Sequence, residues 1–183
     1  MATHVPSPLP GEYKPYAIAY VSLVLKDLPI LNVLRDGAQA TEQLMRSYPH
    51  ARLTVPHAPG EWTIQDVLGH ITDQERVFTY RTLCIARGDQ SDFPGFDQDE
   101  YAAAARANQR SLDNLLDEYR SVRAATISLV AALPDAVLTN IGTSDGHPLS
   151  VRAAIHIIAG HELYHLDSLR TNYGPVSSTE AQR

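Results

Sequence analysis

Four segments with apolar residues at helical spacing constrain the fold of this chain more than any other feature of its sequence. In the first segment, apolar side chains recur between residues 28 and 45 at the 3.6-residue period that places them on one face of a helix. The segment stops before Pro49, because a proline cannot continue a helix. Residues 137–141 are the one weak candidate for a strand, and we do not expect a strand there.

The other three helices are expected from their capping and terminating residues. Thr63 is placed to cap a second helix, with Asp66 three residues later as the reciprocal partner of a capping box. Ser150 is placed to cap the last helix, which Gly174 ends. The expected spans are residues 64–86, residues 99–133 with one break, and residues 151–173.

Four long helices in one chain of 183 residues predict an all-α protein with an antiparallel four-helix bundle. We expect a short irregular N-terminal extension at residues 1–27, the bundle domain at residues 28–173 and a C-terminal tail at residues 174–183. Residues 135–148 are polar and contain glycine, and they are expected to form a loop.

The composition argues against several classes of function. The formal net charge is −6 and the basic residues are scattered, which disfavours binding to a nucleic acid. No apolar run approaches the roughly 20 residues of a membrane span, and the N-terminus lacks the pattern of a signal peptide. Cys84 is the single cysteine, so a reducing cytoplasm is the expected location and a small buried thiol is its expected role.

The last helix contains the sequence H-E-L-Y-H at residues 161–165, which matches the H-E-x-x-H motif of zinc proteases. His161 and His165 lie one turn apart, so both imidazoles can bind one metal ion. A protease of this kind takes its third ligand from further downstream. Ser168 and Thr171 occupy the positions of the extended motif, and Glu180 lies in a polar tail. The motif therefore predicts a metal site without the usual protease ligand.

His70 is the best-placed third ligand, because it lies inside the second helix among apolar residues. Two facing helices of a bundle can bring it opposite His161 and His165, and facing helices are where bundles build metal sites. Three imidazoles leave an open position, as in catalytic zinc sites. The remaining histidines are expected to lie elsewhere: His4, His50, His57, His147 and His156.

Several other polar residues lie near these positions. For Glu162 we favour a structural pairing with an arginine of a neighbouring helix over the role of general base. For Arg81 we favour an interhelical salt bridge over contact with an anionic group of a substrate. Either Asp73 or Gln74 could orient the imidazole of His70, and for Asp73 a solvent-facing position is an equal alternative. We expect structural roles for Glu75 and for Trp62, the latter as the anchor of its helix.

Three stretches of the chain resemble the DinB-like (YfiT-like) metal-binding superfamily. They are P59-GEWTIQDVLGHITDQERVFTY-R81, ARGD at 86–89 with PGFD at 94–97, and A159-GHELYHLDSL-R170. The resemblance covers roughly residues 28–173. It implies a four-helix bundle, a homodimer, and a metal site whose ligands match His70, His161 and His165.

The same resemblance implies that the relatives of this chain include thiol-dependent S-transferases and a mycothiol-dependent isomerase. Isomerase-type members have a carboxylate at the position of His161, so the all-histidine, transferase-like branch is the closer analogue. The leading hypothesis is a metal-dependent enzyme that acts on a small molecule, with Zn²⁺ or Ni²⁺ activating a water or a thiol for transfer or hydrolysis. A low-molecular-weight thiol is the candidate cosubstrate. The alternatives are a non-catalytic bundle or dimer stabilised by a metal, and a zinc peptidase.

Overall fold

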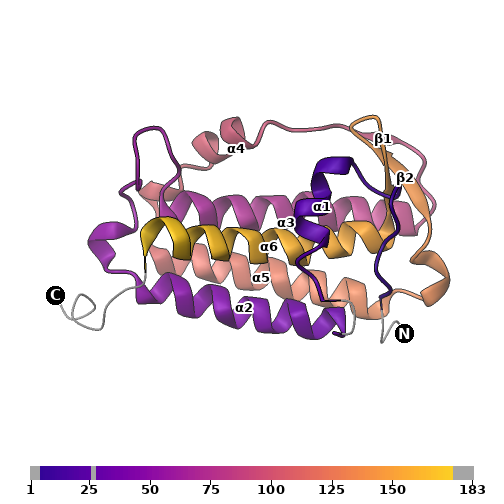
Figure 1. Cartoon of the computed structure of the whole chain (residues 1–183), viewed down its shortest axis with the longest axis horizontal. Coiled ribbons are helices and arrows are strands. Elements are labelled where there is room, and N and C mark those ends of the chain that lie inside the picture. The colour runs from indigo at the N-terminus through magenta and orange to yellow at the C-terminus, as the bar shows by residue number, and fades with distance from the viewer. Residues whose placement is uncertain (1–4, 26–27, 175–183) are drawn as a thin grey trace.

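The computed structural model describes residues 5–25 and 28–174. Its frame is four long helices: α2 (Ile30–Ser47), α3 (Ile64–Ala86), α5 (Leu112–Ala132) and α6 (Val151–Tyr173). Figure 1 shows them packed side by side along the long axis of the molecule, which confirms the predicted four-helix bundle. None of the described helices has the length and apolar character needed to cross a membrane.

The helix ends follow the capping residues expected from the sequence. The Thr63 hydroxyl accepts from the backbone N–H of Asp66, and the Asp66 carboxylate accepts from the backbone N–H of Thr63, which completes the capping box. Ser150 accepts from the N–H of Ala153 at the start of α6. These side chains satisfy backbone donors that a helix start leaves unpaired.

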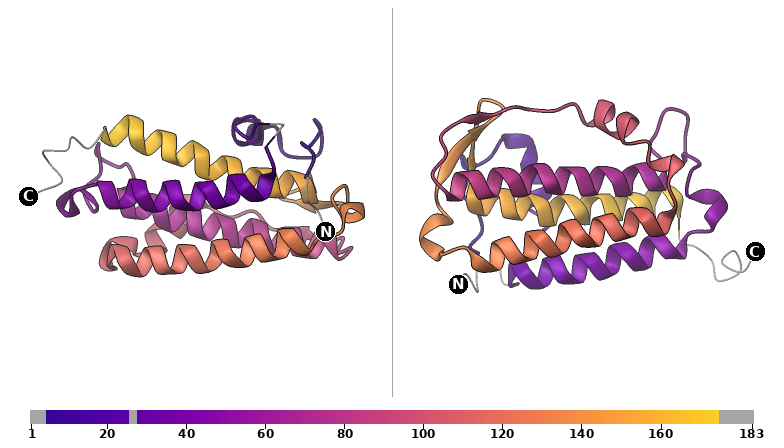
Figure 2. Two further views of the ribbon diagram at one scale, coloured as in Figure 1. Left: turned by 90° about the horizontal axis from the view of Figure 1, so that it is seen from below. Right: turned by 180° about the vertical axis from the view of Figure 1, so that it is seen from behind.

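The direction of the helices differs from the antiparallel bundle predicted from the sequence. The start of α3 lies against the start of α5, where the Gln65 amide donates to the carbonyls of Ala107 and Arg110. Further along, the hydroxyls of Thr79 and Thr126 are 2.9 Å apart, so α3 and α5 run in parallel. A long crossover that carries α4 (Gln98–Ala105) returns the chain along the bundle between them (Figure 2). In contrast, α3 and α6 are antiparallel, as the contact of Trp62 with Tyr173 shows.

A small sheet closes one end of the bundle and was not expected from the sequence. A hairpin of β2 (Ile141–Ser144) and β3 (His147–Ser150) pairs with the short strand β1 (Asp92–Phe93). Its two-residue turn is Asp145-Gly146, and both residues have a positive φ, 53° and 69°. Such turns match the twist of the two strands, and Asp-Gly is among the sequences that favour them. Of the weak strand candidate at residues 137–141, only Ile141 belongs to a strand, and residues 135–137 form a 3₁₀ helix.

A buried polar layer lies between two apolar clusters of the core. One cluster includes Leu34, Phe78, Val130 and Ile158, and the other includes Met45, Ile71, Leu116 and Leu169. On each long helix, at least one buried polar residue lies between members of the two clusters in sequence, and one residue from each helix belongs to this layer. These four residues are Thr41, Glu75, Arg123 and Glu162. Arg123 pairs with both carboxylates at 2.8 Å.

The N-terminal segment lies across α6, and two of its contacts attach it to this helix (Figure 1). Glu12 accepts from Ser150 and Arg152 at the start of α6. The short helix α1 (Ile18–Val21) packs where α6 has Gly160, and a Cβ on this glycine would lie 2.0 Å from the carbonyl oxygen of Tyr20. The absence of a side chain at Gly160 therefore permits the close approach of the two backbones.

Candidate metal centre

Three histidines from α3 and α6 converge at one point of the bundle. The Nε2 atom of His161 is 2.9 Å from that of His70 and 3.0 Å from that of His165. One nitrogen from each residue lies within 4.8 Å of the others, and this is the group of potential metal ligands found among the described residues. The structure thus brings together the three histidines that the sequence singled out.

The local structure explains why these rings meet. His161 and His165 are four residues apart on α6, so they share one face of that helix. The antiparallel packing of α3 on α6 places His70 opposite them, although it is 91 residues from His161 in the chain. His70 and His161 are buried and His165 is partly buried.

Aromatic side chains pack around the three imidazoles. The Trp62 ring is 4.5 Å from the His70 ring and is stacked at 6.3 Å from the His165 ring. The Tyr20 ring meets His161 edge-on at 5.1 Å. We expected Trp62 only as an anchor of its helix. The role of Tyr20 was missed because the sequence of the N-terminal segment has no periodic pattern that predicts its partner.

Burial keeps these imidazoles neutral. It lowers the pKa of His70 to about 3, with the charge of His165 as a further cause, and it lowers the pKa of His165 to about 4. Burial also lowers the pKa of His161 well below its usual range, and His165 and His70 add to this effect. A neutral imidazole has a free nitrogen lone pair, which is the form that binds a metal ion. Three such donors fit Zn²⁺ or Ni²⁺.

Glu162 and Glu75 lie away from this cluster, in the buried polar layer. One oxygen of Glu162 accepts from Thr41 at 2.7 Å and from Tyr119, and the other accepts from Arg123 at 2.8 Å. The structure thus gives Glu162 the arginine partner that we favoured. Both of its oxygens are engaged, so it is not placed to act as a general base.

The remaining candidates lie in different surroundings. Asp73 pairs with the exposed Arg76 at 3.2 Å. Gln74 and Arg81 line a pocket beside His70 and His161. Within the described residues, Arg81 does not form the interhelical salt bridge that we favoured from the sequence, and it donates to the carbonyl of Pro94 instead. Of the other histidines, His4 lies outside the described residues, and His50, His57, His147 and His156 are not part of the cluster. Cys84 is a free, partly buried thiol.

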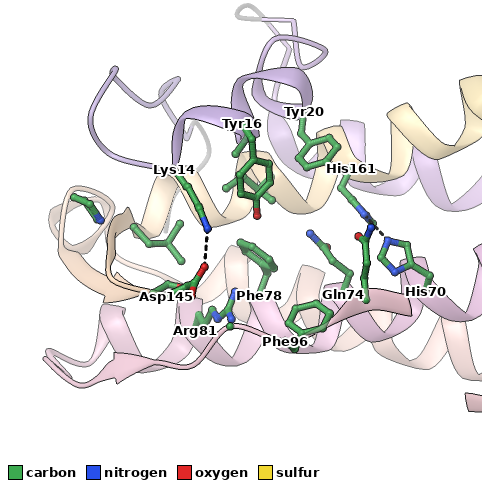
Figure 3. Close-up of a pocket in the computed structure, with 17 residues that line it drawn as sticks. Lys14, Tyr16, Tyr20, His70, Gln74, Phe78, Arg81, Phe96, Asp145 and His161 are labelled. Carbon is green, nitrogen blue, oxygen red and sulfur yellow. Dashed lines mark hydrogen bonds and ion pairs between the residues drawn. The ribbon is translucent and has the colours of Figure 1, made fainter. Parts of the chain in front are cut away.

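The pocket has a volume of about 360 Å³ and extends from the histidines toward the sheet. Figure 3 shows His70 and His161 at one end and Arg81, Lys14 and Asp145 at the other, with Gln74 and Phe78 between them. A pocket of this size accommodates a small organic molecule. The histidine cluster is therefore accessible from a cavity with charged residues at its far end.

A comparison with protein families identifies the relatives of this chain. The model of the DinB superfamily matches residues 34–169, which is most of the chain. The chain belongs to the DinB superfamily. A search of curated protein sequences found no match.

Two solved structures share the fold of this DinB-superfamily protein. YfiT from Bacillus subtilis, described as a probable metal-dependent hydrolase with an unusual four-helix bundle topology, has a TM-score of 0.72 at 15% identity, covering 90% of this chain and 95% of YfiT. A mycothiol-dependent maleylpyruvate isomerase has a TM-score of 0.64 at 14% identity, covering 82% of this chain and 63% of the isomerase. At these identities the likeness establishes the fold.

The segment matched by the DinB model contains all three histidines and Arg81. Lys14 and Tyr20, which line the pocket from the N-terminal segment, lie outside it. The histidine end of the pocket thus lies largely in the matched bundle, whereas part of the pocket wall comes from a segment that the family model does not match.

Proposed function

We propose that this protein is a metal-dependent enzyme in which His70, His161 and His165 bind a divalent ion, Zn²⁺ or Ni²⁺, and that it acts on a small molecule. The observation that carries the proposal is the convergence of three neutral imidazoles beside a pocket. Three protein ligands leave a coordination position for a water or a substrate, as in catalytic zinc sites.

A divalent ion in this position would lower the pKa of a bound water or thiol, so that a nucleophile is present near neutral pH. The protein contributes a fixed and largely dry setting. Trp62 and Tyr20 pack against the imidazoles and limit their rotation. A substrate in the pocket would lie next to His70 and His161, which line it.

We favour hydrolysis or thiol-dependent S-transfer as the reaction class. YfiT is described as a probable metal-dependent hydrolase, and the isomerase is described as mycothiol-dependent. These descriptions support a small-molecule substrate and make a low-molecular-weight thiol a reasonable cosubstrate. A homodimer and a cytoplasmic location stay predictions from the sequence.

The proposal is tested by the metal content of the purified protein. We expect about one ion per chain in the wild type and its loss from His70→Ala, His161→Ala and His165→Ala, because two imidazoles alone bind a metal weakly. His156→Asn is the matched control, since His156 is buried on the same helix but outside the cluster. It should retain the ion. A stoichiometric ion in all three alanine variants, measured by mass spectrometry, would rule out this site.

A non-catalytic module stabilised by a metal is the second candidate, and it makes a different prediction for the metal-free protein. The apolar clusters and the polar layer around Arg123 are built without the three histidines. We therefore expect the chelated protein to keep its helical circular dichroism and a cooperative thermal transition, with a lower Tm because bound metal stabilises the folded state. Unfolding at room temperature on chelation would favour the structural role.

A further inference from the structure

Arg81 is a buried cation without a carboxylate partner among the described residues. It is 4% exposed, and its Nη2 atom donates to the carbonyl of Pro94 at 2.7 Å. Arg123, the other buried arginine of the described chain, is paired with Glu75 and Glu162. A buried charge is costly unless an opposite charge compensates it. An anionic ligand would therefore supply the compensating negative charge that Arg81 lacks.

The one described acidic residue that lines this pocket is already engaged. Asp145 pairs with Lys14 at 2.6 Å, and both line the same end of the pocket as Arg81 (Figure 3). Two cations and one anion leave one net positive charge at this end. A ligand with a single negative charge, such as a carboxylate, would balance it.

Two aromatic rings hold the guanidinium of Arg81 in place. It lies 4.9 Å from the centre of the Phe78 ring and 6.0 Å from that of Phe96. Together with the hydrogen bond to Pro94, these contacts fix its position before a ligand arrives. A fixed guanidinium suits carboxylates, because its planar fork can donate two parallel hydrogen bonds.

Gln74 provides a second polar contact between the two ends of the pocket. Gln74 is 5% exposed. Among the buried side-chain oxygen and nitrogen atoms of the described residues, its Oε1 atom is the one that has no hydrogen-bond partner. Figure 3 shows Gln74 between the histidines and Phe78. A ligand N–H or O–H beside Gln74 would donate to its Oε1 atom, whose burial without a hydrogen-bond partner is unfavourable.

The spacing along α3 sets the length of such a ligand. His70, Gln74 and Arg81 lie on one side of the helix, at intervals of four and seven residues. The rise of the helix separates His70 from Arg81 by about 16 Å. A ligand that reaches both ends is therefore elongated, with its reactive group and its anionic group far apart.

We propose that Arg81 binds the carboxylate of the small molecule that reacts at the histidine cluster, and that Gln74 accepts a hydrogen bond from the middle of that molecule. The substrate class is an elongated molecule with one terminal carboxylate and an internal N–H or O–H group. This inference rests on the proposed function, because the histidines supply the reactive end.

The test compares a carboxylate with its uncharged analogue. The probes are 8-mercaptooctanoate and 8-mercapto-1-octanol, added to the cobalt-substituted protein, where absorption from thiolate bound to cobalt reports binding at the histidines. We expect the acid to bind more tightly than the alcohol. Arg81→Met should weaken the acid roughly 10- to 100-fold, as expected for a charge-assisted hydrogen bond, and change the affinity of the alcohol by less than about twofold. The short 3-mercaptopropionate should show little dependence on Arg81.

Two further variants separate anion binding from a purely structural role of Arg81. Asp145→Asn removes the competing negative charge and should tighten binding of the acid; asparagine also tolerates the positive φ of this position. Arg76→Met removes an exposed cation from the same helix and should leave both affinities unchanged. Equal weakening of acid and alcohol by Arg81→Met would overturn the proposal, as would a tighter fit of octyl phosphate than of octanoate.

The proposed function and this inference fail in different ways. Absence of the cobalt–thiolate band in the wild type would count against the metal site. The anion site is then judged by calorimetry with octanoate and 1-octanol on the metal-free wild type and Arg81→Met. A preference for octanoate that depends on Arg81 supports the anion site, and equal binding by the two proteins refutes it.

Discussion

Replacing Arg123 by alanine should lower the free energy of unfolding by about 3–5 kcal/mol, the range observed when one partner of a buried ion pair is removed. The variant leaves the carboxylates of Glu75 and Glu162 facing each other without a cation, and each of the three side chains is 2% exposed or less. It also removes the donor to the carbonyl of Leu34. Urea denaturation followed by circular dichroism measures the change.

Arg120→Ala is the matched control for this prediction. Arg120 lies three residues earlier on α5 and also pairs with two carboxylates, those of Glu42 and Asp117, but its side chain is 42% exposed. We expect a loss of less than about 1 kcal/mol, because solvent screens an exposed ion pair. Similar losses in the two variants would show that burial of Arg123 does not govern its contribution.

Gly160→Ala should detach the N-terminal segment from α6. The added Cβ would lie 2.0 Å from the carbonyl oxygen and 2.5 Å from the carbonyl carbon of Tyr20, and a backbone cannot yield as a flexible side chain does. Alanine in place of a helical glycine ordinarily gains up to about 1 kcal/mol, so a net loss of stability would report the clash itself. We expect a loss of roughly 1–3 kcal/mol, as for other overpacked sites.

The same variant should expose the region before residue 25 to proteolysis, because α1 would no longer pack on α6. Limited digestion followed by mass spectrometry measures the cleavage sites. Gly88→Ala is a poor control, since Gly88 has a positive φ, whereas Gly69→Ala on α3 meets its nearest neighbour at 3.4 Å and should have a small effect. Protection of the N-terminal segment in Gly160→Ala would contradict the predicted displacement.

Much of the helical framework could be predicted from the sequence because its signals are local. The capping box of Thr63 and Asp66 and the cap at Ser150 place the starts of α3 and α6. The pairing of His70 with His161 followed from the apolar setting of one histidine and the turn spacing of the other two. The structure brings these three together, and their metal binding stays a prediction.

The features that were missed depend on contacts between distant segments. The parallel course of α3 and α5 is set by the path of the crossover, which hydrophobic periodicity does not encode. The contact of Tyr20 with His161 likewise joins residues far apart in the chain, and so does the pair of Glu162 with Arg123, where only the residue type of the partner was predicted. The hairpin is different, because Asp145-Gly146 was a readable turn signal inside the segment expected to be a loop.

The backbone conformation of the hairpin turn restricts which residues can occupy one position at the end of the pocket. At position 145 the positive φ favours aspartate, asparagine or glycine, and these three residues differ in charge at the end of the pocket. A change among them alters the charge presented to a ligand while preserving the turn. A single substitution at position 145 is therefore expected to change the ligand preference of the pocket while the turn is kept.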